Sequence, residues 1–481
     1  MKYEVVIGIE THVQLATKSK LFCGCNNDSR EAKPNAHVCP VCIALPGALP
    51  VLNKAAVELA LKAGLALNAY SDMLEFHTKF DRKNYFYPDS PSGYQITQFD
   101  EPIIGNGFVE FPFEGETKRV GITRAHLEAD AGKLTHPAGK DYSLVDLNRA
   151  GTPLLEIVSE PDMRSAAEAK AYAEELYHLM RYAGVSDCDL YYGNMRFDVN
   201  VSLRLAGQKE FGTRTESKNL NSFRAVAGVV EYEMKRQAEI LDAGEKVVQE
   251  TRGWDESKGE TFSQRTKEEA HDYRYFPEPD LPPVQVTSDM LKVASNGMPE
   301  KMPMELRQEL AGAGISGREV ETLVANIEAA ELWLQLNIEN PEQAKFAFNW
   351  LVGDMLRLAE AKGKSLRESD VSSLTVAAVG EMVAAGKLSS TNSKALLAML
   401  WENDEGAHHV AEREGLLQQS DAGELEAWTD QVIKDNPKPV ADYQKGEAKA
   451  LGFLVGQVMK LSKGQANPPM VNEILKDKLK K

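Results

Sequence analysis

The 481-residue sequence contains no run of about eighteen apolar residues, the length that a membrane-spanning helix requires. The first residues, MKYEVVIGIE, enter an alternating strand pattern directly, without the apolar core and small-residue cleavage site of a signal peptide. Only five cysteines are present, too few for a disulfide scaffold in a chain of this length. These absences predict a soluble cytoplasmic protein with no membrane partner.

Several common catalytic signatures are also missing. Gly363-Lys364-Ser365 resembles the end of a phosphate-binding P-loop, but Leu358 stands where that motif needs glycine. RFDVNVSLR fails as an EF-hand loop because Leu203 occupies the position of the required glycine. No Gly-x-Ser-x-Gly elbow and no Gly-rich dinucleotide fingerprint after a strand is present. The sequence therefore offers neither a familiar hydrolase nor a familiar nucleotide-binding motif.

Basic residues are in deficit, with 55 Lys and Arg against 72 Asp and Glu, a net charge of -17. This balance argues against a protein that coats DNA through bulk charge, so any nucleic-acid contact must be local. One local exception is residues 441–481, which contain more lysines than acids: Lys445, Lys449, Lys460, Lys463, Lys476, Lys478, Lys480 and Lys481. The excess of lysines fits a nucleic-acid contact. It fits equally well a solvated end of a helix, where the helix dipole favours positive charge.

The chain is long enough for several domains. Helical patterns begin at Asn53 and Ser165, and GFVEFPFEGETKRVGITRAHLEAD is typical of a hairpin turning at Glu114-Gly115-Glu116. A proline-rich segment, DYRYFPEPDLPPVQV, ends this mixed part, and helical patterns follow. We predict an α+β (mixed α/β) fold: an antiparallel or mixed sheet with helices over 1–295, an all-α domain over 296–405 and an all-α tail over 406–481.

Four segments share a strand-like alternation that places polar side chains on one face. In VVIGIETHVQL, Glu10 and His12 lie opposite an apolar side. The other segments are TRAHLEAD, RFDVNVSLR and TRTESKN. Their polar faces carry His126 and Glu128; Arg196, Asp198 and Asn200; and Arg214, Glu216 and Lys218.

Each of these faces alone is typical of the wet outer surface of a sheet. Taken together, however, the four faces carry mostly short side chains that can hold a ligand in a defined geometry, such as Asp-Asn-Ser and Glu-His. An ordinary outer face would instead carry interchangeable Thr, Lys and Glu. Carboxylate oxygens suit Mg²⁺, which keeps water or phosphate in its remaining positions, and arginines suit phosphate oxygens. The four faces together therefore favour a site for a metal ion and phosphate.

Four of the five cysteines form two closely spaced pairs, Cys23-x-Cys25 and Cys39-x-x-Cys42. Two such pairs joined by a loop can close a tetrahedral Zn²⁺ site, which is structural when all four positions are filled. The alternatives are four free thiols or a redox pair at Cys39 and Cys42. The spacing favours zinc, with Cys188 as a lone buried thiol.

Longer segments carry a family resemblance: VDLNRAGTPLLEIVSEPD, KFDRKNYFYPDSPSGYQITQ, CPVCIALPGALPVLN and GQVMKLSKGQANP. Together with GIETHVQL, HLEADAGK, RFDVNVSLR, TESKNLNSF and DYRYFPEPDLPP, they resemble the B-subunit family of the aspartyl/glutamyl-tRNA(Asn/Gln) amidotransferases. The likeness runs in family order over nearly the whole chain.

The resemblance implies a ligase that uses ATP and Mg²⁺. The side-chain carboxylate of Glu or Asp on misacylated Glu-tRNA(Gln) or Asp-tRNA(Asn) takes the γ-phosphate of ATP, and ammonia then displaces phosphate to leave the amide. Glutamine is the implied amide donor, hydrolysed by a partner amidase (the A subunit), with a small bridging protein (the C subunit) completing a heterotrimer. The implied fold is a cradle-like catalytic domain, a helical domain and a tail that binds tRNA.

The resemblance also implies roles for individual residues. It implies that five residues take part in catalysis: Glu10, His12, Glu128, Asp198 and Glu216. The expected Mg²⁺ ligands are Glu10, His12, Glu128 and Glu216, although His12 could instead orient a water or a carboxylate. The expected contacts to ATP phosphates are Arg196, Asn200, Arg214 and Lys218, and the expected Zn²⁺ ligands are Cys23, Cys25, Cys39 and Cys42.

Two motifs allow two interpretations each. In KFDRKNYFYPD, the polar residues are expected near the ammonia path or the acceptor end of tRNA, whereas packing explains Tyr85 and Tyr87 equally well. Asp146, Asn148 and Arg149 fit either catalysis or a buried polar network. The alternative function is a non-catalytic tRNA-binding scaffold with a zinc knuckle, which would bind tRNA without dependence on ATP or metal.

Overall fold

The computed structural model describes residues 2–70, 74–266, 273–336, 341–402, 405–418, 422–462 and 464–480. It divides into two compact units, Met1–Met304 and Glu305–Lys481. The first unit combines sheets and helices and the second is helical, which confirms the predicted α+β fold class. Among the described residues, no helix is both long and apolar enough to cross a membrane.

An eight-stranded sheet forms the centre of the first unit, in the order β13-β12-β11-β10-β1-β9-β6-β5. Neighbouring strands are antiparallel except for β11 and β12, which are parallel, so the sheet is mixed as predicted. The strands, in chain order, are β1 (Tyr3–Gln14), β5 (Gly107–Phe113), β6 (Glu116–Ala129), β9 (Pro153–Ser159), β10 (Met195–Leu205), β11 (Thr215–Leu220), β12 (Glu250–Asp255) and β13 (Glu260–Thr266).

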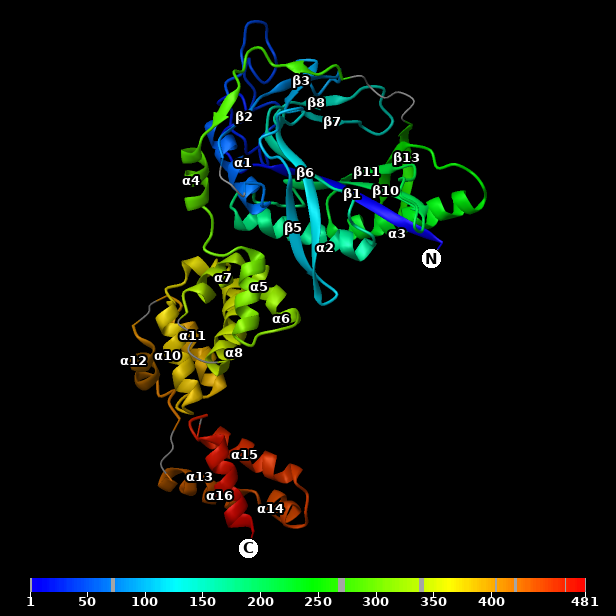
Figure 1. The fold of residues 1–481 in the computed structure, drawn as a ribbon. Helices are drawn as coiled ribbons and strands as arrows, with labels where there is room; N and C mark the ends of the chain where they lie inside the picture. Colours follow the sequence, from blue (N-terminus) through cyan, green and yellow to red (C-terminus); the bar gives the residue numbers. More distant parts are fainter. Residues whose placement is uncertain are drawn as a thin grey trace. The chain divides into compact units, whose positions relative to one another are not determined.

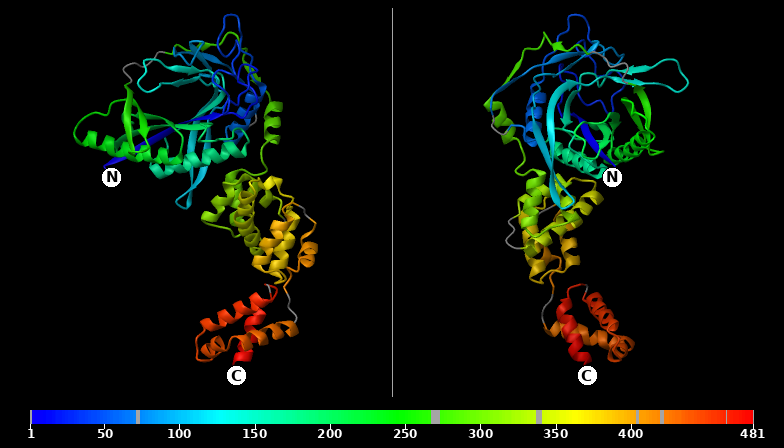
Figure 2. Two further views of the ribbon diagram at one scale, coloured as in Figure 1. Left: turned by 180° about the vertical axis from the view of Figure 1, so that it is seen from behind. Right: turned by 45° about the vertical axis from the view of Figure 1, so that its right-hand side comes forward.

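The two faces of this sheet differ in polarity. On β1, Ile7, Ile9 and Val13 are at most 1% exposed, whereas Glu10 and His12 lie on the opposite face and are partly accessible. Helices α2 (Ala166–Tyr182) and α3 (Phe223–Asp242) lie against the apolar face in Figure 1, and the view from behind in Figure 2 agrees. The polar face, which points away from α2 and α3, can therefore form the floor of a cavity.

Short strands border the polar face. The proline-rich segment contributes β14 (Phe276–Pro277), which pairs with β3 (Asp81–Asn84), and β15 (Val284–Val286), which pairs with β2 (Phe76–Thr78). β3 also pairs with β4 (Tyr94–Thr97), which packs against β6. A further small hairpin joins β7 (Lys133–Thr135) to β8 (Leu144–Asp146). Proline-rich β14 thus lies at a sheet edge, where a missing N–H is tolerated.

Local signals in the sequence are realised in several elements. β5 and β6 form the predicted hairpin, whose turn residues Glu114 and Gly115 both have positive φ (51° and 87°), the geometry of a type I′ turn. Helix α1 (Lys54–Ala66) begins after Asn53, which caps it. Helix α2 begins after Ser165, whose hydroxyl accepts from the Glu168 amide at 3.1 Å.

The remaining elements are helices. Helix α4 (Ser288–Asn296) packs on α1 near the end of the first unit. The unit itself ends at Met304, in the first turn of α5. The last four helices share an apolar core that includes Leu425, Leu454, Val471 and Leu475. The helices after α4 are α5 (Pro303–Gly312), α6 (Arg318–Val324), α7 (Ile327–Leu334), α8 (Pro341–Asn349), a π-helix (Trp350–Met355), α9 (Leu356–Lys362), a 3₁₀ turn (Leu366–Glu368), α10 (Ser373–Ala384), α11 (Ser390–Leu400), α12 (Ala407–Arg413), α13 (Ala422–Asp435), α14 (Pro437–Gln444), α15 (Lys449–Leu461) and α16 (Pro468–Leu479).

Helix α3 is joined to the sheet by a buried carboxylate, Glu233, which is 0% exposed. Its oxygens lie 2.7 Å from Arg236 Nη2 and 3.1 Å from Arg252 Nε, and the Thr261 hydroxyl donates to it at 2.6 Å. Burial raises the pKa of Glu233, but the hydrogen bonds from Arg236 and Thr261 outweigh this and lower it to about 2. The charged form is therefore favoured in the folded state.

Replacing this carboxylate should destabilise the fold at neutral pH. Because the folded pKa is depressed, the stabilisation is full above the unfolded pKa of about 4.5 and is lost as pH falls towards 2. We expect Glu233→Gln to lower the free energy of unfolding by about 3 kcal/mol at pH 7. Urea unfolding at pH 7 and near pH 3.5 measures this, and the difference from wild type should shrink at the lower pH. Exposed Glu239 on the same helix supplies the control, Glu239→Gln, and equal effects of both substitutions would contradict the assignment.

Candidate functional site

The four predicted polar faces lie on β11, β10, β1 and β6, and β9 lies between β1 and β6 in the same sheet. Glu10 pairs in register with Asp198 on β10, and Asn200 pairs with Glu216 on β11. On the other side of β1, His12 pairs with Glu156 of β9, which in turn pairs with His126 of β6. Segments far apart in the sequence thereby contribute to one surface.

The first cluster on this surface contains Glu10, Asp198 and Glu216, each of which offers an oxygen within 4.8 Å of the others. The Lys218 ammonium lies 3.1 Å from Asp198 and 3.0 Å from Glu216. The Asn200 amide donates to Glu10 at 3.1 Å. Lys218 and Asn200, predicted to contact phosphate, therefore contact these carboxylates directly.

The second cluster contains His12, Glu128 and Glu156, again with one possible ligand atom from each within 4.8 Å of the others. His12 Nε2 lies 3.8 Å from Glu128 and 3.6 Å from Glu156, and His126 Nε2 lies 3.3 Å from Glu156. The predicted Mg²⁺ ligands thus divide between two clusters, with Glu10 and Glu216 in one and His12 and Glu128 in the other.

Two members of the site were missed by the sequence analysis. Glu156 is a single acid within the mostly apolar strand PLLEIVS, so only its position beside His12 shows its importance. Asn219 has a φ of 58°, and its backbone N–H donates to Asp198 at 2.8 Å. A left-handed residue is uncommon outside glycine, and Asn is among the residues that adopt it most readily, so this conformation fixes Asp198.

The electrostatics of the site favour a bound cation. Burial, and then the charges of Glu156 and Glu216, raise the pKa of Glu10. Burial lowers the pKa of His126, but the carboxylates of Glu128 and Glu156 outweigh it and raise the value to about 9. The Nδ1 atoms of His12 and His126 are buried without a hydrogen-bond partner among the described residues. Crowded carboxylate oxygens match the ligands that Mg²⁺ prefers, so the residues present fit this ion.

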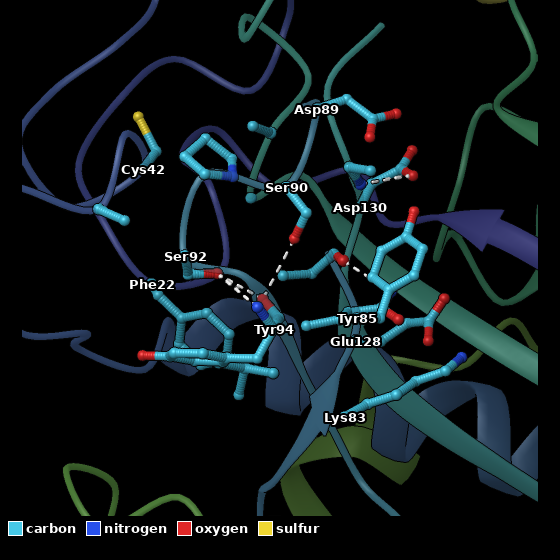
Figure 3. Close-up of a pocket in the computed structure, with 18 of the residues that line it drawn as sticks. Phe22, Cys42, Lys83, Tyr85, Asp89, Ser90, Ser92, Tyr94, Glu128 and Asp130 are labelled. Atoms are coloured by element: carbon cyan, nitrogen blue, oxygen red, sulfur yellow. Dashed lines mark hydrogen bonds between the residues drawn. The ribbon is translucent and has the colours of Figure 1, made fainter. Parts of the chain in front are cut away.

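All three residues of the second cluster line a cavity of about 590 Å³, together with Glu10 and Asp198 of the first cluster. Lys83 from β3 extends into it beside Glu128, as Figure 3 shows, and Tyr85 and Cys42 line other parts of the wall. Burial lowers the pKa of Lys83, but the surrounding groups, Glu128 foremost among them, together outweigh this and raise it. The cavity therefore places an ammonium group next to the second carboxylate cluster.

Two of the predicted phosphate-binding arginines differ in their surroundings. Arg196 lies in the cavity, where its guanidinium contacts Asp130 at 3.3 Å. Arg214 precedes β11, is exposed, and makes no hydrogen bond or ion pair within the described part of the chain. It lines a second, smaller cavity that also includes Glu10. Among the four residues predicted to contact phosphate, Arg214 is therefore the one without a polar partner in the described part of the chain.

The other candidate segments have largely structural contacts. In KFDRKNYFYPD, Lys79 pairs with Asp100 at 2.9 Å and Arg82 binds Glu278 in a bidentate pair at 2.7 and 2.8 Å. Tyr87 stacks on Tyr85 with ring centroids 4.9 Å apart. Of this motif, Lys83, Tyr85 and Asp89 line the large cavity.

The VDLNRAGTP segment forms a polar network around the cysteine loop. Asp146 accepts from the Asn35 amide at 3.0 Å, and Asn148 accepts from the His37 amide at 2.8 Å. Arg149 contacts Asp130 at 3.3 Å and donates to the Gly132 carbonyl at 2.7 Å. These contacts support the interpretation of this motif as a polar network that holds the loop beside the cavity, in which Asn148 is buried and Asp146 and Arg149 are partly exposed.

The four clustered cysteines can hold a metal ion. Their sulfurs lie within 4.8 Å of one another, and none is in a disulfide. The Cys39 and Cys42 sulfurs are 3.9 Å apart, close to the separation of about 3.8 Å expected for tetrahedral ligands at about 2.3 Å from zinc. Hydrogen bonds from the Cys23 thiol and the Cys39 amide outweigh burial and lower the pKa of Cys42 to about 4. A thiolate, the form that binds metal, is therefore favoured at Cys42, whereas the same hydrogen bond raises the pKa of Cys23.

The tail lysines fall into two groups, apart from Lys463 and Lys481, which lie outside the described residues. Lys478 pairs with Asp430 and Lys480 with Asp477. The others are exposed and form no ion pair within the described tail: Lys445, Lys449, Lys460 and Lys476. Two of them lie in α15, Lys449 at its start and Lys460 near its end.

Comparison with known proteins places the chain in a family. Residues 5–292 match the GatB/GatE catalytic domain, and residues 334–479 match the GatB domain. The chain is 47% identical over 485 residues to the B subunit of the aspartyl/glutamyl-tRNA(Asn/Gln) amidotransferase from Carboxydothermus hydrogenoformans, covering 100% of this chain and 99% of that protein. It is 46% identical over 486 residues to the protein of the same name from Caldicellulosiruptor saccharolyticus, with all of both chains covered. The chain therefore belongs to the GatB/GatE family, as a B subunit of the tRNA-dependent amidotransferases.

Proposed function

We propose that this chain catalyses the ATP-dependent amidation of Glu or Asp carried on misacylated tRNA. The side-chain carboxylate attacks the γ-phosphorus of ATP and ADP leaves. Ammonia then attacks the activated acyl carbon and phosphate leaves, which gives Gln-tRNA(Gln) or Asn-tRNA(Asn). The proposal rests mainly on two carboxylate clusters that lie side by side, five of whose six residues line one cavity. It also rests on the full-length similarity of the chain to proteins of this name.

The residues of the site would divide the work between them. Glu10, Asp198 and Glu216, together with His12, Glu128 and Glu156, would hold Mg²⁺, which when bound neutralises charge on the phosphoryl oxygens. Lys218 and Arg196 would bring further positive charge to the cavity, and Arg214 would contact phosphate from the smaller cavity. Lys83 would lie beside the substrate carboxylate, since it extends next to Glu128.

The proposed assembly is a heterotrimer with an amidase subunit and a small bridging subunit. The amidase would release ammonia from glutamine, which makes the whole assembly a carbon–nitrogen ligase with glutamine as amide donor. Because the proposed substrate is a tRNA, we expect the assembly to be located in the cytoplasm.

Co-expression with a candidate amidase subunit, followed by an amidation assay on both misacylated tRNAs, tests the function. We expect amide formation that requires ATP and Mg²⁺. Binding of tRNA without any ATP-dependent amidation would instead favour the non-catalytic scaffold, and the assay also decides between Glu-tRNA(Gln) and Asp-tRNA(Asn).

We expect the cysteine cluster to hold about one structural zinc ion per chain. Elemental analysis of purified protein should find this zinc in wild type and lose it in Cys23→Ser and Cys39→Ser, because each removes a ligand. Cys188→Ser is the matched control, since that thiol is buried away from the cluster. Zinc that stays bound after either ligand substitution would contradict the assignment.

We expect the unpaired tail lysines to contact tRNA phosphates. Replacing Lys445, Lys449 and Lys460 together by Gln should weaken tRNA binding and reduce the slope of log affinity against log salt by up to about one per lysine. The matched control replaces Lys478 and Lys480, which already pair with acids, and should have a smaller effect. If the triple variant binds tRNA with unchanged affinity, the tail does not contribute to tRNA binding.

A further inference from the structure

Lys20 is a fully buried lysine that the proposed reaction does not use. Its side chain is 0% exposed, and its ammonium donates to the His37 carbonyl at 2.8 Å and to the Leu147 carbonyl at 3.3 Å. No carboxylate pairs with it in the part of the chain that the structure describes. Lysine is almost never fully buried without a charged partner, because an ammonium that has lost its water needs a compensating anion. Two neutral carbonyls leave this requirement unmet.

The surroundings of Lys20 belong to the cysteine cluster. Its backbone N–H donates to the Cys25 carbonyl at 3.0 Å, and its side chain binds the carbonyl of His37 in the loop between the two cysteine pairs. A Cβ on Gly151 would lie 3.7 Å from Lys20 Cδ and 3.8 Å from Cys42 Cβ. The side chains of Lys20 and Cys42 therefore border the same space, which this glycine leaves free.

We propose that Lys20 is the counter-charge of the cysteine cluster and strengthens its hold on a divalent metal ion bound by four thiolates. The inference rests on the proposed zinc ion and goes beyond it, because it gives a role to a residue that is not a ligand. Lys20 acts through the thiolates and does not bind the metal itself.

The charge of the metal centre provides the first argument. Four thiolates around Zn²⁺ leave two excess negative charges, and groups outside the ligand set tune a metal site by stabilising its ligands. The hydrogen bond from Cys23 lowers the pKa of Cys42 most, and the positive charge of Lys20 lowers it further. Lys20 thus favours the form of Cys42 that binds metal.

Comparison with another buried cation provides the second argument. Arg252 is 7% exposed, and its guanidinium pairs with the carboxylates of Glu233 and Glu250. Lys20 is buried more completely and has no such carboxylate in the described ranges. The thiolates of the cysteine cluster supply the anion that Lys20 lacks.

The position of the cluster provides the third argument. Cys23 and Cys42 line the larger cavity, and Figure 3 shows Cys42 in its wall. Uncompensated negative charge in this wall would repel the anionic acceptor end of tRNA. Lys20 reduces that charge without occupying the cavity, because it is buried and is not among the lining residues.

Two substitutions of Lys20 separate its charge from its hydrogen bonds. Lys20→Gln removes the charge but keeps two N–H donors for the His37 and Leu147 carbonyls, whereas Lys20→Met removes both. We expect both variants of the full-length chain to bind Zn²⁺ about tenfold more weakly than wild type, measured by competition with a chelator of known affinity. Lys18→Met is the matched control, because Lys18 is an exposed lysine in the same segment, and it should leave the affinity unchanged.

Iron in the same site gives an independent measurement. With four thiolates, Fe²⁺ leaves one more negative charge than Fe³⁺, so a nearby ammonium favours the reduced form. We expect Lys20→Gln to shift the balance between the two forms about tenfold, which lowers the one-electron reduction potential of the iron-loaded full-length chain by about 59 mV. A role of Lys20 in loop structure alone would not produce this shift.

The outcomes separate the inference from the zinc assignment. Zinc affinity that falls in Lys20→Met but not in Lys20→Gln would overturn the inference, because only the hydrogen bonds would then matter. Unchanged zinc affinity in both variants, or an unchanged reduction potential in Lys20→Gln, would overturn it while leaving the zinc assignment in place. If Lys20→Met does not fold, Lys20→Gln decides by its zinc affinity and its potential. If wild type binds no zinc, the zinc assignment fails and the inference fails with it.

Discussion

Glu10→Gln should reduce the rate of ATP-dependent amide formation about 10²- to 10³-fold, the size of loss typical when one preorganised electrostatic group is removed. Glu10 lies where the two cavities meet, and its carboxylate belongs to the cluster with Asp198 and Glu216. Gln keeps the shape and can still accept the Asn200 hydrogen bond, so only the charge is lost. The measurement is the amidation rate on misacylated tRNA, with size-exclusion chromatography to confirm that the subunits still assemble.

Glu4→Gln is the matched control for this experiment. Glu4 lies on the same strand and the same face, but it pairs with Arg204 and Arg164 away from both clusters. We expect the control to keep nearly the full rate. A normal rate in Glu10→Gln would remove Glu10 from the mechanism, whereas equal losses in both variants would point to a general effect of charge on this strand.

Glu156→Gln should cause a loss of activity that added Mg²⁺ partly restores. Glu156 contacts His12 and His126. Burial raises its pKa, but the hydrogen bond and charge of His126 outweigh this and lower it, so the side chain carries a full negative charge. Removing this charge should raise the Mg²⁺ concentration needed for half-maximal rate by about 10- to 100-fold. A Mg²⁺ titration of the amidation rate measures the change.

Glu160→Gln provides the comparison for Glu156. Glu160 follows the same strand, but its carboxylate accepts from the Thr123 hydroxyl at 2.7 Å and lines neither cavity. It should leave the Mg²⁺ requirement unchanged. If Glu156→Gln lowers the rate without altering the Mg²⁺ requirement, the second cluster does not hold the ion.

Local patterns in the sequence predicted much of the fold. The hairpin at Glu114-Gly115 and the helices that begin after Asn53 and Ser165 are confirmed, because turn and capping signals act over a few residues. The alternation that sets Glu10 and His12 opposite Ile9 and Val13 is also confirmed. These features depend on residues close together in the sequence, so they can be predicted without knowing which distant segments pack against them.

The composition of the site depended on strand order, which local patterns do not contain. β9 lies beside β1 although about 140 residues separate them, and only this placement brings Glu156 to His12. The division of the acids into two clusters follows from the same order, since β10 and β11 lie on one side of β1 and β9 and β6 on the other. Arg214 precedes β11, so strand alternation could not predict its exposure in the smaller cavity.

Asp130 connects two parts of the catalytic unit. It is almost fully buried, and its carboxylate contacts both Arg196, which lies among the proposed phosphate-binding groups, and Arg149, which belongs to the network that holds the cysteine loop. An uncompensated buried charge is costly, so both arginines must keep their places together. Arg149 and Asp130 therefore link the network around the cysteine loop to Arg196 in the cavity. We expect loss of the proposed zinc to disturb the orientation of Arg196 without removing any carboxylate from the cavity.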